Sequence, residues 1–212
     1  MNLSVKIKDL VLIMLMIFGL QSCSTQKNNA NPTPEPVKTV EIALEKPKNK
    51  EENCFKNAAD RPELYLPLLK NKTVAIVANQ TSLLADKTHL VDFLVQNNIK
   101  IKHIFAPEHG FRGTADAGEH VKNGIDTKTG LPIISLYGDN KKPKAAQLDG
   151  LDILVFDIQD VGVRFYTYIS TLHYVMEACA ENSIPVILLD RPNPNADYID
   201  GPVREEAQKS FI

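Results

Sequence analysis

The sequence lacks several features that would point directly to a function. Its 24 basic and 26 acidic residues nearly balance, so no excess of one charge indicates a nucleic-acid or polyanion partner. No apolar run reaches the roughly 20 residues that a membrane-spanning helix needs. Internal repeats and the Gly-rich phosphate loops of the G-x-G-x-x-G and Walker types are also absent. These absences argue against a nucleic-acid-binding protein and a nucleotide-binding Rossmann domain, while a hydrophobic content of 43% is ordinary for a globular domain.

Residues 1–23 have the features of a bacterial lipoprotein signal peptide. A basic start at Lys6 and Lys8 is followed by an apolar run over residues 10–20, too short for an ordinary membrane span but suited to a signal-peptide core. The run ends in Leu20-Gln21-Ser22-Cys23, which resembles a lipobox. A plain secretory signal is disfavoured because the cysteine sits where the motif requires it. We therefore expect Cys23 to be lipidated and the protein to be exported and held at the membrane by this anchor, on the periplasmic or outer-membrane face.

Residues 24–53 are predicted to form a flexible tether, and residues 54–212 a folded domain. The tether is rich in Asn, Pro, Lys and Glu, so it cannot bury enough apolar surface to offset the entropy of ordering. The two cysteines outside the leader are Cys54 and Cys179. An exported protein could join them, but Cys179 falls on the apolar face of a predicted helix. A buried free thiol is therefore the favoured interpretation.

The domain alternates strand-like and helix-like segments. Continuous apolar runs predict strands covered on both faces, at residues 73–78, 102–106, 132–136, 152–157 and 185–190. Apolar residues at helical spacing predict helices at residues 63–70, after an N-cap at Thr88, at 141–147 and at 166–182. This order predicts an α/β fold, a three-layer Rossmann-like domain with a mainly parallel sheet of about five strands.

Polar residues gather directly after these runs. Ligands of open α/β sheets bind beyond the carboxyl ends of the strands, so these segments carry the candidate site. Polar loops are common, but two Gly-flanked segments here, residues 107–113 and 159–164, each pair a carboxylate with an arginine. A third segment places Asp190 next to Arg191. Solvated turns do not need such pairs, which favours a functional edge.

Four segments at this edge resemble the signature segments of the NamZ family, long catalogued as a domain of unknown function. They are Ala106-Pro-Glu-His-Gly-Phe-Arg-Gly113, Ser135-Leu-Tyr-Gly138, Phe156-Asp-Ile-Gln-Asp-Val-Gly-Val-Arg-Phe-Tyr-Thr-Tyr168 and Leu189-Asp-Arg-Pro-Asn-Pro194. The resemblance runs from about residue 69 to residue 203, in order and at family-like spacing. It implies a Rossmann-like N-terminal domain, a smaller C-terminal domain and a cleft between them. It also implies an exo-β-N-acetylmuramidase that releases N-acetylmuramic acid from the non-reducing end of peptidoglycan fragments.

The sequence departs from the family in its length. Family members continue well past the segment that here reads Asp200-Gly-Pro-Val203, whereas this sequence stops at Ile212. We therefore expect the C-terminal domain of the family to be absent, because the sequence is a fragment or the gene is truncated. Two functions stay open: a hydrolase acting on muropeptide or disaccharide substrates, and a catalytically incomplete lipoprotein module that binds cell-wall sugars. No cofactor is expected for either.

Glycoside hydrolysis usually needs a proton donor and a second group that stabilises or captures the oxocarbenium-like carbon. With the family context, Glu108 is the predicted acid/base, with His109 beside it as a tuning partner; a structural salt bridge from Glu108 to an arginine is the alternative. Asp160 is the preferred second group, ahead of Glu119 and Asp157, and the 2-acetamido group of the substrate is a further possibility. This interpretation expects Glu108 and Asp160 to leave neighbouring parallel strands on the same rim and to face one sugar pocket.

The remaining candidates are predicted to bind the substrate. A guanidinium matches the lactyl carboxylate of muramic acid, so the candidate readers of that group are Arg112, Arg164 and Arg191. Tyrosines can stack on sugar faces or donate hydrogen bonds, which selects Tyr137, Tyr166 and Tyr168, although one of the last two is expected only to pack. Amide and carboxylate candidates are Asn79, Gln80, Asn193 and Glu119. The histidines and carboxylates of residues 103–120 match no metal-ligand spacing, so no metal site is predicted.

Overall fold

The structure is a computed structural model that describes residues 55–113 and 123–211. The predicted signal peptide, the lipidation site at Cys23, the tether, Cys54 and Glu119 all lie outside these residues. Within the described ranges, every helix is too short or too polar to cross a membrane.

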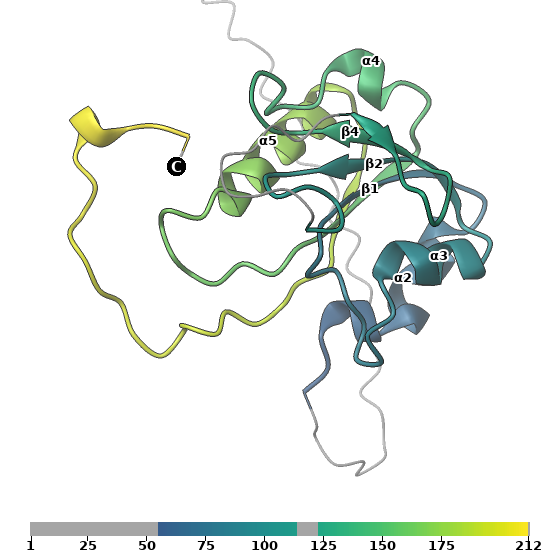
Figure 1. The fold of residues 1–212 in the computed structure, drawn as a ribbon, viewed down its shortest axis with the longest axis horizontal. Helices are drawn as coiled ribbons and strands as arrows, with labels where there is room; N and C mark the ends of the chain where they lie inside the picture. The colour runs from purple at the N-terminus through teal and green to yellow at the C-terminus, as the bar shows by residue number, and fades with distance from the viewer. Residues whose placement is uncertain (1–54, 114–122, 212) are drawn as a thin grey trace, which may run out of the picture. The chain divides into compact units, whose positions relative to one another are not determined.

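A six-stranded sheet forms the centre of the described chain (Figure 1). Its order is β3-β4-β2-β1-β5-β6, and every neighbouring pair is parallel except β3 and β4. The strands are β1 (Thr73–Ala78), β2 (Lys100–Ala106), β3 (Gly124–Ile125), β4 (Pro132–Ser135), β5 (Ile153–Asp157) and β6 (Val186–Leu188). The α/β fold and the five predicted strands are confirmed. The sequence missed β3, because it has only two residues, both exposed, and depends on its antiparallel pairing with β4.

In the described part of the chain, four α-helices accompany the sheet: α2 (Pro62–Leu69), α3 (Leu90–Gln96), α4 (Ala145–Leu148) and α5 (Tyr168–Glu181). Short 3-10 turns, η2 (Ala58–Asp60) and η3 (Glu206–Gln208), lie near the two ends of the described chain. Pro62 occupies the first turn of α2, where its missing N–H costs no hydrogen bond. The predicted N-cap of α3 was Thr88, but the cap is His89, whose side chain accepts a hydrogen bond from the N–H of Val91.

Both faces of the sheet are buried, as continuous apolar runs predict. Along β1, Val74, Ile76 and Ala78 pack with α2 and α3, whereas Ala75 and Val77 pack with α4 and α5. Figure 1 shows the two helix groups on opposite sides of the sheet. The domain therefore has the three predicted layers.

Cys179 lies in the second of these cores, within α5. Its side chain is fully buried and is a free thiol, as expected from its place on the apolar face of the helix. Burial raises the pKa of this thiol to about 11, because the apolar surroundings disfavour the thiolate.

The sheet order also fixes where a ligand can bind. After β1, the chain adds β2 and β4 to the sheet on one side of β1. It then crosses over and adds β5 and β6 on the other side of β1. The topological switch of the sheet is therefore between β1 and β5. In an open parallel sheet, the crevice at the carboxyl ends of such strands is the usual binding position.

Candidate functional site

A cavity of about 450 Å³ opens at the carboxyl ends of β1, β2 and β5. Loops after these three strands and the first turn of α5 form its wall. Five of the predicted site residues line it: Gln80, Glu108, His109, Tyr166 and Tyr168. Five residues that the sequence did not select complete the lining: Thr81, Gln159, Val161, Phe165 and Thr167. The structure therefore brings a carboxyl group, two amides and three aromatic rings together at the switch between β1 and β5.

Glu108 enters this cavity from a sharp turn that follows β2. His109 and Gly110 both have positive φ angles, 68° and 77°, and the N–H of Gly110 donates to the carbonyl of Pro107. Glycine takes this conformation without steric cost, so Gly110 lets the chain reverse directly behind the carboxyl group. The hydroxyl of Thr167 donates to Oε2 of Glu108 at 3.0 Å.

The alternative prediction for Glu108 was a structural salt bridge to an arginine, and this bridge is not found among the described residues. Glu108 forms no ion pair with any of them, and its polar neighbours are the hydroxyls of Thr167 and Tyr137. The negative charge of Glu108 raises the pKa of the Tyr137 phenol. Among the described residues, Glu108 is therefore held by a neutral donor, the hydroxyl of Thr167, rather than by a cation.

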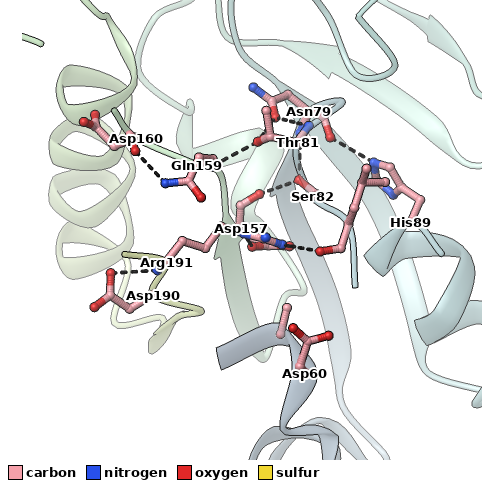
Figure 2. A network of polar contacts seen from close by, with 12 residues as sticks. Asp60, Asn79, Thr81, Ser82, His89, Asp157, Gln159, Asp160, Asp190 and Arg191 are labelled. Atoms are coloured by element: carbon pink, nitrogen blue, oxygen red, sulfur yellow. Dashed lines mark hydrogen bonds and ion pairs between the residues drawn. The ribbon is translucent and has the colours of Figure 1, made fainter. Parts of the chain in front are cut away.

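Hydrogen bonds tie the loops after β1 and β5 together (Figure 2). Asn79 is fully buried, and its Oδ1 accepts from the N–H and the hydroxyl of Thr81 at 2.8 and 2.6 Å. Ser82 donates to the carbonyl of Asp157, and the N–H of Gln159 donates to the Thr81 hydroxyl at 3.0 Å. Asn79 thus holds the turn that carries Gln80 and Thr81, and it does not itself line the cavity.

His89 supports the same turn from α3. Its Nδ1 accepts from the N–H of Val91, and its Nε2 lies 2.9 Å from the carbonyl of Asn79. Since Nδ1 acts as an acceptor, Nε2 carries the proton and donates to that carbonyl. Burial lowers the pKa of this histidine, so its imidazole is neutral near neutral pH.

Two of the three candidate arginines form buried ion pairs outside the cavity. Arg191 makes two bonds to fully buried Asp157, from Nε at 2.6 Å and from Nη2 at 3.0 Å. Arg112 bonds both Asp92 and Asp126, and its guanidinium strongly lowers the pKa of Asp126. These contacts neutralise carboxylates that are otherwise inaccessible to water.

Arg164 contacts backbone instead. Its guanidinium donates to the carbonyls of Asp200 and Pro202, which attaches the C-terminal segment to the loop after β5. Arg112 lines a second cavity of about 510 Å³ that shares Gln80 with the first.

Asp160 lies on the same rim as Glu108, but the rest of the expected geometry is not found. Strand β1 stands between β2 and β5, so the two carboxylates do not leave neighbouring strands. Asp160 lines a different, mainly apolar cavity of about 140 Å³ beside α5. Its carboxylate accepts from the N–H of Gly162 at 2.6 Å, which turns the side chain back into its own loop. The predicted shared pocket is therefore wrong for this arrangement of the loop.

Asn193 sits against the same loop. Gly162 has a φ of +71°, and a Cβ atom added there would lie 2.3 Å from Nδ2 of Asn193. Asn193 lines a further cavity of about 760 Å³ beneath the C-terminal segment, together with Arg164 and Phe165. Phe165 is the one described residue that lines both this cavity and the one with Glu108.

The most informative residue missed by sequence reasoning is Thr167. It lies between Tyr166 and Tyr168. The two tyrosines were selected as rings that could stack on a sugar, whereas the hydroxyl of Thr167 was not selected. A usable signal existed: Thr167 is the second residue of the strongest predicted helix, residues 166–182, and threonine is common as the N-cap at the start of a helix. A side chain at the start of a helix can bond a group that lies beyond that end, and the Thr167 hydroxyl bonds Glu108.

Comparisons with known proteins found a matching family and a similar curated protein. Residues 74–212 match the family described as Exo-beta-N-acetylmuramidase NamZ, N-terminal. The curated protein Peptidoglycan beta-N-acetylmuramidase NamZ of Bacillus subtilis (strain 168) is 49% identical over 150 residues, which are 70% of this chain and 36% of the relative.

Two solved structures of DUF1343 family proteins from Bacteroides fragilis NCTC 9343 are also similar. They are 45% and 38% identical, with TM-scores of 0.63 and 0.65. Each match covers 74% of this chain and 40% of the solved chain. The chain therefore spans at most two fifths of the length of these relatives.

Proposed function

This chain belongs to the exo-β-N-acetylmuramidase NamZ family, and from that membership we propose that it is a glycoside hydrolase releasing N-acetylmuramic acid from the non-reducing ends of peptidoglycan fragments. The observation that carries the proposal is Glu108, a half-buried carboxyl group in a cavity of about 450 Å³ at the switch point of the sheet. Its role is to protonate the leaving glycosidic oxygen and later to activate water.

The lining of the cavity supports a sugar ligand. Phe165 and Tyr166 present partly exposed rings, 69% and 39% accessible, which suit stacking on a sugar face. Gln80 and Gln159 carry amides that both donate and accept, as sugar hydroxyls require. Tyr168 is largely buried, which fits the expectation that one of the two tyrosines serves mainly in packing.

The second catalytic group is assigned to the substrate. Among described residues, Glu108 is the only carboxylate that lines the cavity, and Asp160 would have to leave its bond with Gly162 to join it. A substrate that carries a 2-acetamido group can use its own carbonyl oxygen to capture the anomeric carbon. We therefore favour assistance by this group, with Asp160 and Glu119 as the protein alternatives.

The lactyl carboxylate of muramic acid is assigned to Arg112. Arg191 is only 5% exposed, whereas 29% of the Arg112 side chain is accessible next to Gln80. Arg112 already donates to Asp92 and Asp126, and its exposed edge can still donate to a further carboxylate.

The test is hydrolysis of a chromogenic β-N-acetylmuraminide by the purified chain. Glu108→Gln keeps the shape of the side chain and should lower kcat by at least about 100-fold, as loss of a general acid/base does. Glu63→Gln, an exposed glutamate in α2, is the matched control and should leave kcat unchanged. Undiminished cleavage by the Glu108→Gln variant would remove Glu108 from the mechanism.

A second function is favoured by one specific observation: among the described residues, Glu108 is the only carboxylate that lines the cavity, so no second carboxylate stands beside it. A module of this kind would bind cell-wall sugars through the same cavity without cleaving them. Calorimetry with N-acetylmuramic acid separates the two proposals. Binding that is weakened by Tyr166→Ala, together with no cleavage by the unmodified chain, supports the binding module.

We also propose export and lipid anchoring at Cys23, on the basis of the lipobox-like segment alone. Labelling cells with a fatty-acid analogue should mark the protein, and Cys23→Ala should abolish the label and release the protein from the membrane fraction. An equally labelled Cys23→Ala variant contradicts the proposal.

A further inference from the structure

A second cavity continues the one that holds Glu108 and lies beneath the C-terminal segment. This C-terminal cavity has a volume of about 760 Å³, is lined from residues 162–165 and 193–202, and shares Phe165 with the first. We infer that it binds the sugar that leaves when the glycosidic bond is cleaved, and that this sugar is N-acetylglucosamine. The inference rests on the proposed function, because only a glycoside hydrolase has a leaving sugar, whereas binding of the sugar can be tested without cleavage.

Three aromatic side chains lead from the cavity with Glu108 into the C-terminal cavity. Of these two cavities, Tyr166 lines the first, Phe165 lines both, and Tyr198 lines the second. The rings of Phe165 and Tyr166 pack edge to face, with their centroids 5.9 Å apart. Phe165 and Tyr198 are 69% and 64% exposed, so both rings have free surface that a ligand can cover. Successive sugar rings can therefore stack along this path.

Two other cavities adjoin the one with Glu108, and neither suits a neutral sugar. The cavity of about 510 Å³ carries three cations, Lys87, Arg112 and Lys128, against two carboxylates, which suits the acidic lactyl group. The cavity beside α5 that shares Tyr168 has a volume of about 140 Å³, below the roughly 300–1,000 Å³ of ordinary ligand pockets. The C-terminal cavity is thus the neighbour that remains for the leaving sugar.

The charges that line the C-terminal cavity balance and have partners. Arg164 and Asp200 contribute one charge of each sign. The Arg164 guanidinium donates to the carbonyls of Asp200 and Pro202, and the Asp200 carboxylate accepts from the N–H of Gly201 at 2.6 Å. N-acetylglucosamine, which alternates with N-acetylmuramic acid in peptidoglycan, has no lactyl group and no charge. It therefore matches a wall that offers rings and polar groups without an excess of either charge.

Bonds to the loop after β5 hold the C-terminal wall of this cavity in place. Besides the contacts of Arg164, the Nδ2 of Asn195 donates to the carbonyl of Val161 at 2.6 Å. The Oδ1 of Asn195 accepts from the hydroxyl of Tyr198 at 3.5 Å. A ring carried on an anchored segment needs less ordering when a ligand binds, and such ordering weakens association.

The first experiment compares two substrates that differ only in the leaving group. The β-1,4-linked disaccharide of N-acetylmuramic acid and N-acetylglucosamine has a second ring, whereas methyl β-N-acetylmuraminide has none. Release of N-acetylmuramic acid gives kcat/KM for both. In Tyr198→Ala the preference for the disaccharide, the ratio of the two kcat/KM values, should fall about 10-fold, because the leaving ring loses its stacking partner.

Two further variants make this result specific to the ring of Tyr198. Tyr198→Phe keeps the ring and should keep the preference. Phe55→Ala, the matched control, removes a ring that is 69% exposed but lines neither cavity, and it should also keep the preference. An unchanged preference in Tyr198→Ala would overturn the inference.

The second experiment needs no cleavage. N-acetylglucosamine is added to the Glu108→Gln chain, and the backbone amide signals are followed by NMR. The signals of residues 195–201 should shift until the site is saturated, and Tyr198→Ala should raise Kd about 10-fold. Shifts confined to residues around position 108, no shifts at all, or an unchanged Kd in Tyr198→Ala would overturn the inference.

The two experiments together separate the inference from the proposed function. If the signals of residues 195–201 shift as expected but the unmodified chain cleaves neither substrate, the sugar site stands and the proposed hydrolase activity fails. If the chain cleaves both substrates but these signals do not shift, the hydrolase activity stands and the leaving-sugar site is wrong.

Discussion

Glu108 and Asp157 are both carboxylates at the carboxyl-terminal rim of the sheet, yet their surroundings are opposite. Asp157 is fully buried and bonded twice by Arg191, which is itself only 5% exposed. Glu108 is half-buried, faces a cavity and is held by one uncharged hydroxyl, that of Thr167. Burial raises the pKa of Asp157, and the guanidinium opposes that effect by stabilising the charged form. The comparison indicates that Asp157 serves the fold, whereas Glu108 is available for proton exchange with a ligand.

The largest expected effect comes from breaking the Asp157 pair. Arg191→Met leaves a buried carboxylate without its cation and should lower the free energy of unfolding by about 3–5 kcal/mol. Urea denaturation followed by circular dichroism measures this loss. Adding Asp157→Leu to the same chain removes the unpaired charge and should recover part of the stability. A loss below 1 kcal/mol for Arg191→Met would mean that the pair is not structural, and the contrast with Glu108 would disappear.

The second prediction concerns His103, a buried base that, unlike Asp157, has no ion-pair partner among the described residues. His103 in β2 is 4% exposed, its Nε2 has no hydrogen-bond partner among described residues, and burial lowers its pKa to about 4. The unfolded chain takes up a proton near pH 6.5, before the folded chain does. Stability is therefore fully present above pH 6.5 and is lost as the pH falls from 6.5 toward 4, by about 2 kcal/mol at pH 5.

Urea midpoints between pH 7.5 and pH 5 test this pH dependence. His103→Leu should remove that part of the loss, and His173→Leu, an exposed histidine of α5, is the matched control that should keep it. Equal acid sensitivity of the His103→Leu variant and the unmodified chain would contradict the assignment to His103.

The smallest effect on stability is expected at the candidate catalytic residue. Glu108→Gln keeps the shape of the side chain and leaves no buried charge unpaired, so the free energy of unfolding should change by less than about 1 kcal/mol. The same urea experiment, at pH 7.5, measures the change. A loss as large as that of Arg191→Met would assign Glu108 to the fold rather than to chemistry.

Local sequence patterns predicted most of the fold. The apolar runs of β1 and β5 are read correctly because both faces of these strands are buried, so that no polar alternation obscures them. Strand β3 could not be predicted, since its two exposed residues become a strand only by pairing with β4. The cap of α3 was misplaced by one residue, because His89 replaces the commoner threonine cap through its Nδ1 atom.

The site was less predictable than the fold. The rule that ligands bind beyond parallel strands selected Glu108, Gln80 and Tyr166 together, and they line one cavity. The partners of the arginines could not be foreseen: Asp92 and Asp126 meet Arg112 from helix α3 and from the end of β3, through contacts distant in sequence. The separation of Asp160 from Glu108 likewise follows from strand order, which local patterns do not contain.

The position of β1 has a consequence for the order in which the molecule is assembled. β1 is the first strand of the described chain, yet it occupies the interior of the sheet between β2 and β5. While the polypeptide is being synthesised, one edge of β1 stays unsatisfied until Ile153–Asp157 have left the ribosome. A nascent chain that has reached only β4 therefore cannot close its core, and closure must wait for the distant pairing that makes such topologies slow to fold. Closure of this core therefore waits until residue 157, the last of β5, has been synthesised.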